Sequence, residues 1–202
     1  MDNHKFAHRG INVDIYQPVS IIKPETIYLN NHIIISEFAY INGGLGTYIG
    51  NHVHIAAQSC ISGGGFCIID DFAGLSAGVK LITGSAQFNG EGLTSPTLPR
   101  EYQAIKKSFI IIEKHVVLAT NVIVHPGITI KEGTIVASGS IVTKDTEPWS
   151  IYMGTPAKKI KKRDSKQIIE LENKVYKDQH LTPSDFSVVI NKIKRELYET
   201  NS

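Results

Sequence analysis

The chain is poor in cysteine and has no long apolar run. Only two of its 202 residues are cysteine, Cys60 and Cys67, and neither belongs to a Cys/His motif. This predicts free structural thiols and no metal site. No stretch approaches the roughly 18 apolar residues of a membrane span, and the first ten residues lack the apolar core of a signal peptide. We therefore expect a cytoplasmic protein without membrane attachment.

An excess of one charge sign is also missing. Lys and Arg total 21, against 19 Asp and Glu, so the formal net charge is only +2. Nucleic-acid binding requires a cationic field that this balance does not supply, and we expect no nucleic-acid partner.

What the sequence does contain is a repeat with a period of six over residues 112–146. Its large aliphatic residues are Ile112, Leu118, Val124, Ile130, Val136 and Val142, and smaller residues follow four places later at Val116, Val122, Ile128, Thr134, Ser140 and Thr146. A helical face repeats near 3.6 residues and a half-buried strand at two, so a period of six indicates a solenoid. Three hexads close one triangular coil, and stacked coils pair as parallel β-sheets around an aliphatic column.

The same phase continues upstream with two extra residues per coil. The inward residues are predicted to be Leu29, Ile35, Ile41, Ile49, Ile55, Ile61, Ile69, Leu75 and Leu81, with Ile15, Ile21 and Ile27 in a weaker first coil. The fifth-place residues include Leu45, Gly65 and Ser85. The extra residues, Thr47-Tyr48 and Cys67-Ile68, are predicted to bulge at a corner. We therefore expect an irregular lead-in (1–14), a β-helix domain (15–163) and a helical tail (164–202).

A polar, Gly/Pro-rich loop interrupts the repeat over residues 84–111. Loops of this length on a rigid solenoid tend to carry function, although a solvated decorative loop is the alternative. The loop contains Phe88, Leu93, Leu98 and Tyr102, so we expect it to pack against another surface.

The residues after the repeat are first cationic and then helical. Five of the six residues from Lys158 to Arg163 are basic. Helical spacing follows over 165–178, and Thr182-Pro183-Ser184-Asp185 predicts a second helix start. The apolar face of that second helix consists of Phe186, Val189, Ile190, Ile193 and Leu197. It must be covered by the prism or by a neighbouring subunit.

The hexads, together with residues 148–160 (PWSIYMGTPAKKI), resemble the C-terminal signature of the hexapeptide-repeat acyltransferases. The resemblance implies an all-β solenoid: a left-handed parallel β-helix with a mid-coil loop and a C-terminal α-helical tail. It also implies homotrimers whose active sites lie between adjacent prisms, with acetyl-CoA or another acyl-CoA along the outer wall.

This resemblance assigns a CoA wall to small outward residues and to the basic end. The residues concerned are Ala119, Ala137, Ser138, Thr155, Pro156, Lys158, Lys159 and Lys162. Small side chains would let a pantetheine arm approach the strand edges, and the lysines would face its phosphates. The alternative is that small residues simply suit tight corners.

The acceptor is indicated by what the loop lacks. Sugar O-acetyltransferases of this superfamily place a general-base histidine in the loop, and none occurs between Gly84 and Ser108. The loop is similar to those of N-acyltransferases that act on nucleotide-linked amino-deoxy sugars. It carries Ala86-Gln87 where that group commonly has an Asp pair, which leaves the sugar and the acyl group open. We expect a role in surface polysaccharide synthesis, such as O-antigen. The alternatives are O-acetylation of a sugar or glycan and a non-catalytic trimeric binding protein.

Three residues are catalytic candidates: His125, Glu91 and Asn89. His125 holds an outward hexad place and would face the intersubunit cleft, where it could orient the substrate or accept a proton. Glu91 and Asn89 lie in the loop, where a carboxylate could orient an amine. The alternative for both His125 and Glu91 is an exposed surface residue. The remaining histidines of the repeat, His32, His52, His54 and His115, are expected at the surface.

Overall fold

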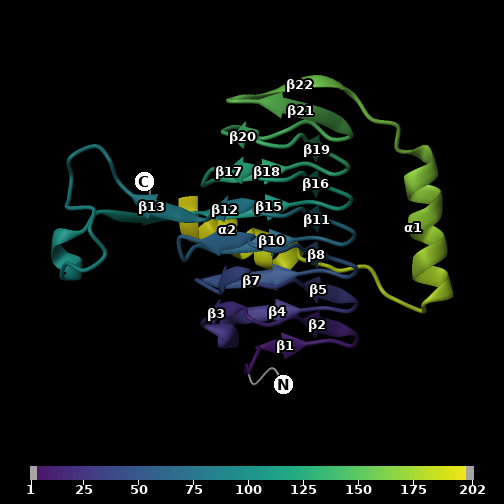
Figure 1. The fold of residues 1–202 in the computed structure, drawn as a ribbon, viewed down its shortest axis with the longest axis horizontal. Helices are drawn as coiled ribbons and strands as arrows, with labels where there is room; N and C mark the ends of the chain where they lie inside the picture. Colours follow the sequence, from purple (N-terminus) through teal and green to yellow (C-terminus); the bar gives the residue numbers. More distant parts are fainter. Residues whose placement is uncertain (1–3, 199–202) are drawn as a thin grey trace.

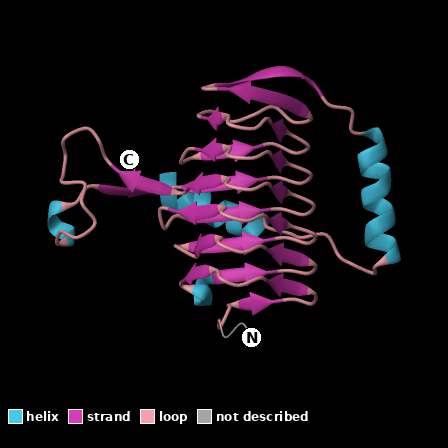
Figure 2. Cartoon of the chain, in the orientation of Figure 1, coloured by secondary structure: helices cyan, strands magenta, loops and turns pink. Residues whose placement is uncertain are grey.

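The computed structural model describes residues 4–198, which form a three-sided prism of parallel sheets with an arm and two helices (Figures 1 and 2). Sheet 1 contains β1 (His8–Arg9), β4 (Ile27–Leu29), β7 (Gly46–Ile49), β10 (Phe66–Ile69), β15 (Phe109–Ile112) and β18 (Ile128–Ile130). Sheet 2 contains β2 (Val13–Ile15), β5 (Ile33–Ile35), β8 (His54–Ile55), β11 (Gly74–Leu75), β16 (Val117–Leu118), β19 (Ile135–Val136), β21 (Ser150–Gly154) and β22 (Ala157–Lys162). Sheet 3 contains β3 (Ser20–Ile22), β6 (Tyr40–Asn42), β9 (Cys60–Ser62), β12 (Lys80–Ile82), β17 (Ile123–Val124) and β20 (Ile141–Val142).

The chain visits sheets 1, 2 and 3 in turn, so the prism has three edges. We call them edge 1/2, edge 2/3 and edge 3/1, after the sheets that their turns connect. The remaining elements are the arm strands β13 (Gly84–Ala86) and β14 (Ile105–Lys107), the short 3-10 helices η1 (Pro24–Thr26) and η2 (Arg100–Tyr102), and the helices α1 (Lys166–Asp178) and α2 (Ser187–Tyr198).

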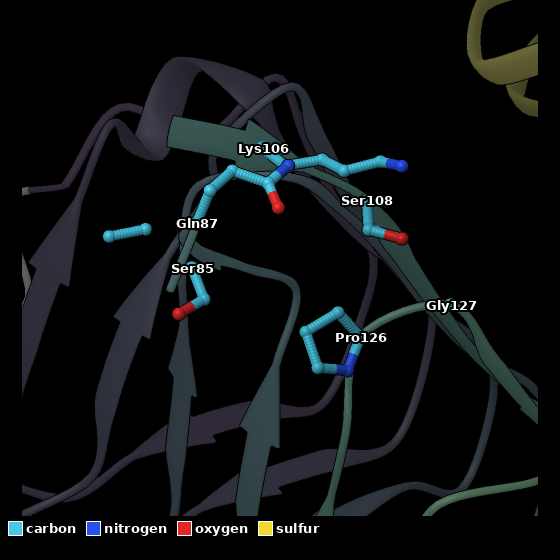
Figure 3. Close-up of a pocket in the computed structure, with 7 residues that line it drawn as sticks. Ser85, Gln87, Lys106, Ser108, Pro126 and Gly127 are labelled. Atoms are coloured by element: carbon cyan, nitrogen blue, oxygen red, sulfur yellow. The ribbon is translucent and has the colours of Figure 1, made fainter. Parts of the chain in front are cut away.

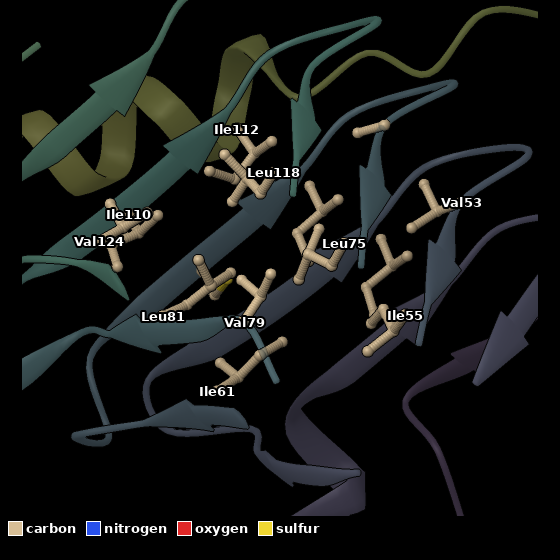
Figure 4. Close-up of a cluster of buried hydrophobic side chains, with 14 of the residues drawn as sticks. Val53, Ile55, Ile61, Leu75, Val79, Leu81, Ile110, Ile112, Leu118 and Val124 are labelled. Carbon is tan, nitrogen blue, oxygen red and sulfur yellow. The ribbon is translucent and has the colours of Figure 1, made fainter. Parts of the chain in front are cut away.

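The predicted aliphatic column is confirmed as the core of the prism (Figure 4). Leu118 and Val124 have no exposed surface, and their counterparts in the coils on either side are equally buried. The ladder also passes the loop without interruption, because Ile69 pairs with Ile112 and Leu75 with Leu118. The insertion therefore occupies one turn and leaves the coil stacking intact.

The predicted corner bulge at Thr47-Tyr48 and Cys67-Ile68 is wrong. These residues lie within β7 and β10, where Thr47 and Cys67 are fully buried inside the prism. Leu45, expected to fill a bend as a fifth-place residue, is 40% exposed. The longer coils instead widen their turns at residues 43–45 and 63–65 of edge 3/1.

Glycine is required in the second of these wide turns because other backbone approaches closely. A Cβ on Gly65 would lie 2.1 Å from the Ser108 carbonyl oxygen, and one on Gly63 2.2 Å from the Gly84 nitrogen. Cys67 now fills the fifth-place position inside the prism, and burial raises the pKa of its thiol to about 12. Both cysteines are free, and this one is held in its unreactive protonated form.

The boundaries differ from the predictions at two places. The coil resumes at Phe109 instead of Ile112, because β15 pairs with β10 along all four of its residues. Ordered strands also begin at His8, within the stretch expected to be irregular, and Val13 is buried there. The first coil was difficult to recognise because only part of its inward positions carry aliphatic side chains.

The two helices cover different parts of the prism. α2 packs on the outer face of sheet 1, where Ile193 joins Phe66, Ile68 and Ile111 in a second apolar cluster. The cover expected for this helix face is thus supplied by its own prism; the side chain of Leu197 lies outside the described residues. α1 runs along edge 1/2, where its Tyr176 ring meets Phe72 edge-on at 5.2 Å (Figure 1).

Edge 1/2 carries a column of five neighbouring rings, of which the first four are stacked and the last, Trp149, is tilted. Successive ring centroids of His32, His52, Phe72, His115 and Trp149 lie 4.7, 5.3, 5.1 and 5.9 Å apart. The surface position expected for His115 is wrong, since it is only 7% exposed and its Nε2 lies 2.9 Å from Glu172 of α1. The polar hexad position became buried because α1 covers this edge.

Asp70, on the same edge, gives a prediction for stability against pH. Burial and the neighbouring Asp71 raise its pKa to about 6, opposed by a hydrogen bond from the Asp71 backbone N–H. The folded state therefore holds a proton that the unfolded state releases near pH 4, and stability falls as pH rises through this window. Asp70→Asn is expected to raise the free energy of unfolding by about 1–3 kcal/mol at pH 8 and to change it little at pH 4. Urea denaturation at both pH values measures this; an equal gain at pH 4 would contradict it.

Candidate active site

A two-stranded arm leaves edge 3/1 between β12 and β15 (Figure 1). β13 and β14 pair antiparallel, with Gly84 opposite Lys107 and Ser85 opposite Lys106. Thr83 closes the neck of the arm: its backbone oxygen accepts from the Ser108 N–H, and its hydroxyl donates to the Ser62 carbonyl oxygen at 2.7 Å. The ribbon is therefore fixed to the prism at its base.

Beyond the ribbon, residues 87–104 form the arm tip with η2. Phe88 is 85% exposed, and Leu93 and Tyr102 are also exposed. The packing expected for these apolar side chains is thus not provided by their own prism.

A cleft of about 390 Å³ lies where the ribbon meets the next turn of edge 3/1. Its lining residues are Ser85, Ala86, Gln87, Lys106, Ser108, Pro126 and Gly127. Figure 3 shows the polar side chains of the ribbon on one side and the Pro126 ring on the other. The cleft offers two hydroxyls, one amide and one ammonium group, and its lining contains no carboxylate.

Most of these lining residues were missed by sequence reasoning. Ser85 was expected to fill a bend as a fifth-place residue, but it stands in β13 and lines the cleft. Ala86 and Gln87 were noted only as the place where the related group commonly has an Asp pair, and no pattern marked Lys106 and Ser108. For those two the only signal was position, because the cleft lies where the hexads stop.

His125 stands directly beside this cleft. It precedes Pro126 in the turn between β17 and β18, its side chain is exposed, and its backbone N–H donates to the Val142 carbonyl oxygen at 3.0 Å. The structure thus places His125 one residue before Pro126 of the cleft lining, and His125 itself is not among the lining residues.

Asn89 and Glu91 are placed elsewhere. Both are exposed in the arm tip, where the Asn89 side-chain oxygen accepts from the Glu91 N–H at 3.2 Å. Neither lines the cleft of its own chain.

The predicted CoA wall is only partly assembled. Ala119, Ala137 and Ser138 follow one another along edge 2/3, where the Thr155-Pro156 turn joins them through a hydrogen bond from Gly154 N–H to Ser140 Oγ at 3.0 Å. Ala119 and Ala137 are half-buried and Ser138 is exposed. Because all three side chains are small, little protrudes from the backbone along this edge.

The predicted lysine cluster is spread along β22 instead of gathered. Lys158 pairs with Met153 beside the turn, whereas Lys162 pairs with Ser150 at the opposite end of the strand, near edge 1/2. Lys159 forms an ion pair with Glu147, so part of its charge is neutralised. Of the three lysines, only Lys158 and Lys159 lie at the end of β22 that adjoins edge 2/3.

The cleft and the small-residue wall lie at opposite edges of sheet 3. The cleft is on edge 3/1 and the wall on edge 2/3, with the strands of sheet 3 between them. The cleft and the small-residue wall of one chain therefore face in different directions.

Two other classes of site find no support in residues 4–198. No three His, Cys, Asp or Glu side chains in this range are arranged to hold a metal ion. None of the helices there has the length and apolar character to cross a membrane.

Comparison with known proteins gives close relatives over most of the chain. No protein-family model matches. The chain is 32% identical to dTDP-4-amino-4,6-dideoxy-D-glucose acyltransferase of Escherichia coli over 169 residues, covering 83% of this chain and 88% of the relative.

Solved structures support the same relationship. AntD, an N-acyltransferase from Bacillus cereus in complex with dTDP and 3-hydroxybutyryl-CoA, superposes with a TM-score of 0.80 at 34% identity, covering 87% of this chain and 93% of AntD. A variant of AntD in complex with dTDP-4-amino-4,6-dideoxyglucose and coenzyme A matches with the same TM-score and identity, over 86% of this chain and 91% of the variant. A hexapeptide-repeat acetyltransferase from Vibrio cholerae, at 21% identity, a TM-score of 0.57 and coverage of 79% and 72%, shares the fold.

The uninterrupted hexad core, the mid-coil arm and this similarity lead to one conclusion. The chain belongs to the left-handed β-helix acyltransferases, in the group of acyl-CoA-dependent enzymes that N-acylate nucleotide-linked amino-deoxy sugars.

Proposed function

We propose that this protein transfers an acyl group from acyl-CoA to the amino group of a dTDP-linked amino-dideoxy sugar for surface polysaccharide assembly in the cytoplasm. The observation that carries the choice of an amine is the cleft, whose lining holds no imidazole or carboxylate base. The E. coli relative and AntD support dTDP as the nucleotide. Acetyl-CoA is the donor that the sequence resemblance favours, and 3-hydroxybutyryl-CoA is the competing donor because AntD was solved with it.

The reaction needs little from the side chains. The amine lone pair attacks the thioester carbonyl, a C–N bond forms, the C–S bond breaks, and the nitrogen loses a proton while the departing thiolate gains one. A neutral amine is nucleophilic enough that orientation contributes more than a strong base. In this scheme Ser85, Gln87 and Ser108 orient the sugar, His125 positions the amine, and backbone N–H groups polarise the thioester carbonyl.

The donor side of the site is proposed along edge 2/3. The low surface at Ala119, Ala137 and Ser138 allows the pantetheine arm to approach, and Thr155 and Pro156 bound it at the upper turn. Lys158 and Lys159 suit the phosphates of CoA as point charges. In this arrangement the nucleotide part of CoA extends along β22 to Lys162.

We also propose a homotrimer in which two half-sites, the cleft and the small-residue wall, meet between chains. The half-sites of one chain lie at opposite edges of sheet 3, and the exposed apolar residues of the arm lack a partner surface on their own prism. The arm would then bring Asn89 and Glu91 to a neighbouring site. An active species that sediments at the mass of one chain would contradict this assembly.

The test is release of CoA by the purified protein with dTDP-linked 3-amino and 4-amino sugars, using dTDP-linked hydroxyl sugars as controls. Turnover is expected with amines alone. His125→Ala is expected to lower kcat less than about tenfold, since an orienting role is smaller than the roughly 10²–10⁴-fold effect of a general base. Turnover of hydroxyl sugars only, or loss on the larger scale, would favour sugar O-acetylation. A folded protein that neither turns over nor binds CoA would favour the non-catalytic binding protein.

A further inference from the structure

The charge of the cleft is set by one side chain. Among its seven lining residues Lys106 is the only ionisable one, and the ion pairs formed within residues 4–198 do not include it. Figure 3 shows the Lys106 side chain running above Ser108 at the upper side of the cleft. A ligand in this cleft therefore meets a positive charge that no carboxylate in the lining of the same chain offsets.

The ribbon register puts Lys106 on the same face as the polar side chains of the cleft. Lys106 stands directly opposite Ser85, and alternation along the strands puts Gln87 and Ser108 on the same face. The turn that closes this face is Pro126-Gly127, which His125 precedes. Lys107 belongs to the other face, where its Cε lies 4.0 Å from the position that a Cβ on Gly64 would take.

An amino sugar brings a specific difficulty to such a reaction. Its amine is largely protonated near neutral pH, and an ammonium has no lone pair with which to attack a thioester. An enzyme without a base in the cleft must therefore receive the amine in its neutral form. A neighbouring cation favours that form, because two positive charges in one partly desolvated cleft repel each other.

We propose that the Lys106 ammonium holds the acceptor amine of the bound nucleotide-linked sugar in its neutral, nucleophilic form by opposing a second positive charge in the cleft. This inference rests on the proposed function, and it gives Lys106 an electrostatic task separate from binding. It also gives a meaning to Ala86-Gln87, since an acidic pair at these positions would favour the ammonium.

Few other charged groups face the cleft. His125 stands beside it on the turn, Lys107 lies on the opposite ribbon face, and Lys80 is directed away, donating to the Gln58 carbonyl oxygen at 3.0 Å. The charged residues of the arm tip, Glu91, Arg100 and Glu101, are exposed and do not line the cleft. Lys106 is thus the only charged side chain that its own chain places in the lining of the cleft, to which the proposed trimer would add Glu91 from a neighbouring arm.

The test is the pH dependence of kcat at saturating acyl-CoA and dTDP-linked amino sugar, which reports ionisation in the bound complex. Lys106→Gln is expected to move the acidic limb upward by about one pH unit, the size expected for two like charges roughly 6 Å apart at an effective dielectric constant of about 40. At pH 7 the variant would be about tenfold slower, and the two rates would converge at alkaline pH.

Two matched variants separate charge from shape. Lys106→Arg retains the cation and is expected to keep the wild-type midpoint. Lys107→Gln makes the same charge change on the opposite ribbon face and is also expected to leave the midpoint in place.

Four results would overturn the inference. A rise in KM for the sugar with an unchanged midpoint would assign Lys106 to the diphosphate. A pH-independent fall in kcat would assign it to the thioester oxyanion. Identical pH profiles of kcat for the wild type and an active Lys106→Gln enzyme would show that Lys106 has no such role. The absence of turnover with every nucleotide-linked amine would overturn the proposed function together with this inference.

Discussion

Replacing Asp71 with alanine is expected to detach the C-terminal tail from the prism and to lower the free energy of unfolding by about 3–4 kcal/mol. The Asp71 side chain has no exposed surface. Its carboxylate accepts from the Tyr176 hydroxyl at 2.5 Å, from the Ser184 N–H at 2.9 Å and from the Asn51 backbone N–H at 2.5 Å. One buried group therefore connects the coil to both α1 and the segment before α2.

The size of this effect follows from the donors that would be left without an acceptor. Burial and the Asp71 carboxylate raise the pKa of Tyr176, so its hydroxyl remains a donor across the usual pH range. Each buried donor that loses its partner costs about 1–3 kcal/mol. Denaturant unfolding and limited proteolysis between residues 179 and 186 measure the loss.

Two variants calibrate the Asp71 result. Tyr176→Phe removes one donor and is expected to lower the free energy of unfolding by about 1 kcal/mol. Asp71→Asn keeps part of the acceptor capacity, so its loss should fall between those of Tyr176→Phe and Asp71→Ala. Activity at low temperature should change little, because edge 1/2 lies away from the cleft and from the small-residue wall. An Asp71→Ala protein with wild-type stability and a protease-resistant tail would refute the connection.

The second large effect is expected at the proposed donor wall. Ser138→Trp places a bulky ring on the low surface of edge 2/3, where a pantetheine arm would have to lie. We expect KM for acyl-CoA to rise about 100-fold or more, equivalent to roughly 2.7 kcal/mol of lost binding. Stability should be unaffected because Ser138 is exposed.

A matched control uses the same edge. Glu37 is exposed in the corresponding turn of a coil near the N-terminus, so Glu37→Trp adds the same ring far from the proposed donor site. It should leave KM for acyl-CoA unchanged. An unaltered KM in Ser138→Trp, measured by steady-state CoA release, would move the donor to another surface.

The hexad pattern allowed the coil core to be predicted residue by residue. A position that recurs every six residues returns to the same place in each triangular coil, so Leu118 or Val124 could be placed inward without knowing any contact. Errors arose where the coil length changed. Two extra residues could be absorbed in a strand or in a turn, and only the glycine turn at residues 63–65, packed against the neck of the arm, decides that Cys67 points inward.

The cleft was less predictable for a related reason. The turn at Pro126 and Gly127 belongs to the repeat, whereas Ser85 and Lys106 face each other only through the pairing of two arm strands separated by the whole loop. His115 was misassigned because its burial depends on α1, which returns to edge 1/2 from far along the chain.

The sequence by itself determined the solenoid, its inward residues and the position of the interruption, since each follows from a local repeat and a rigid coil geometry. Only the tertiary structure decided that the cleft contains a lysine and no acid, that the cleft and the small-residue wall face different directions, and that Asp71 connects the tail to the prism. Those features depend on contacts between segments that are distant in the sequence, and a local periodicity does not predict such contacts.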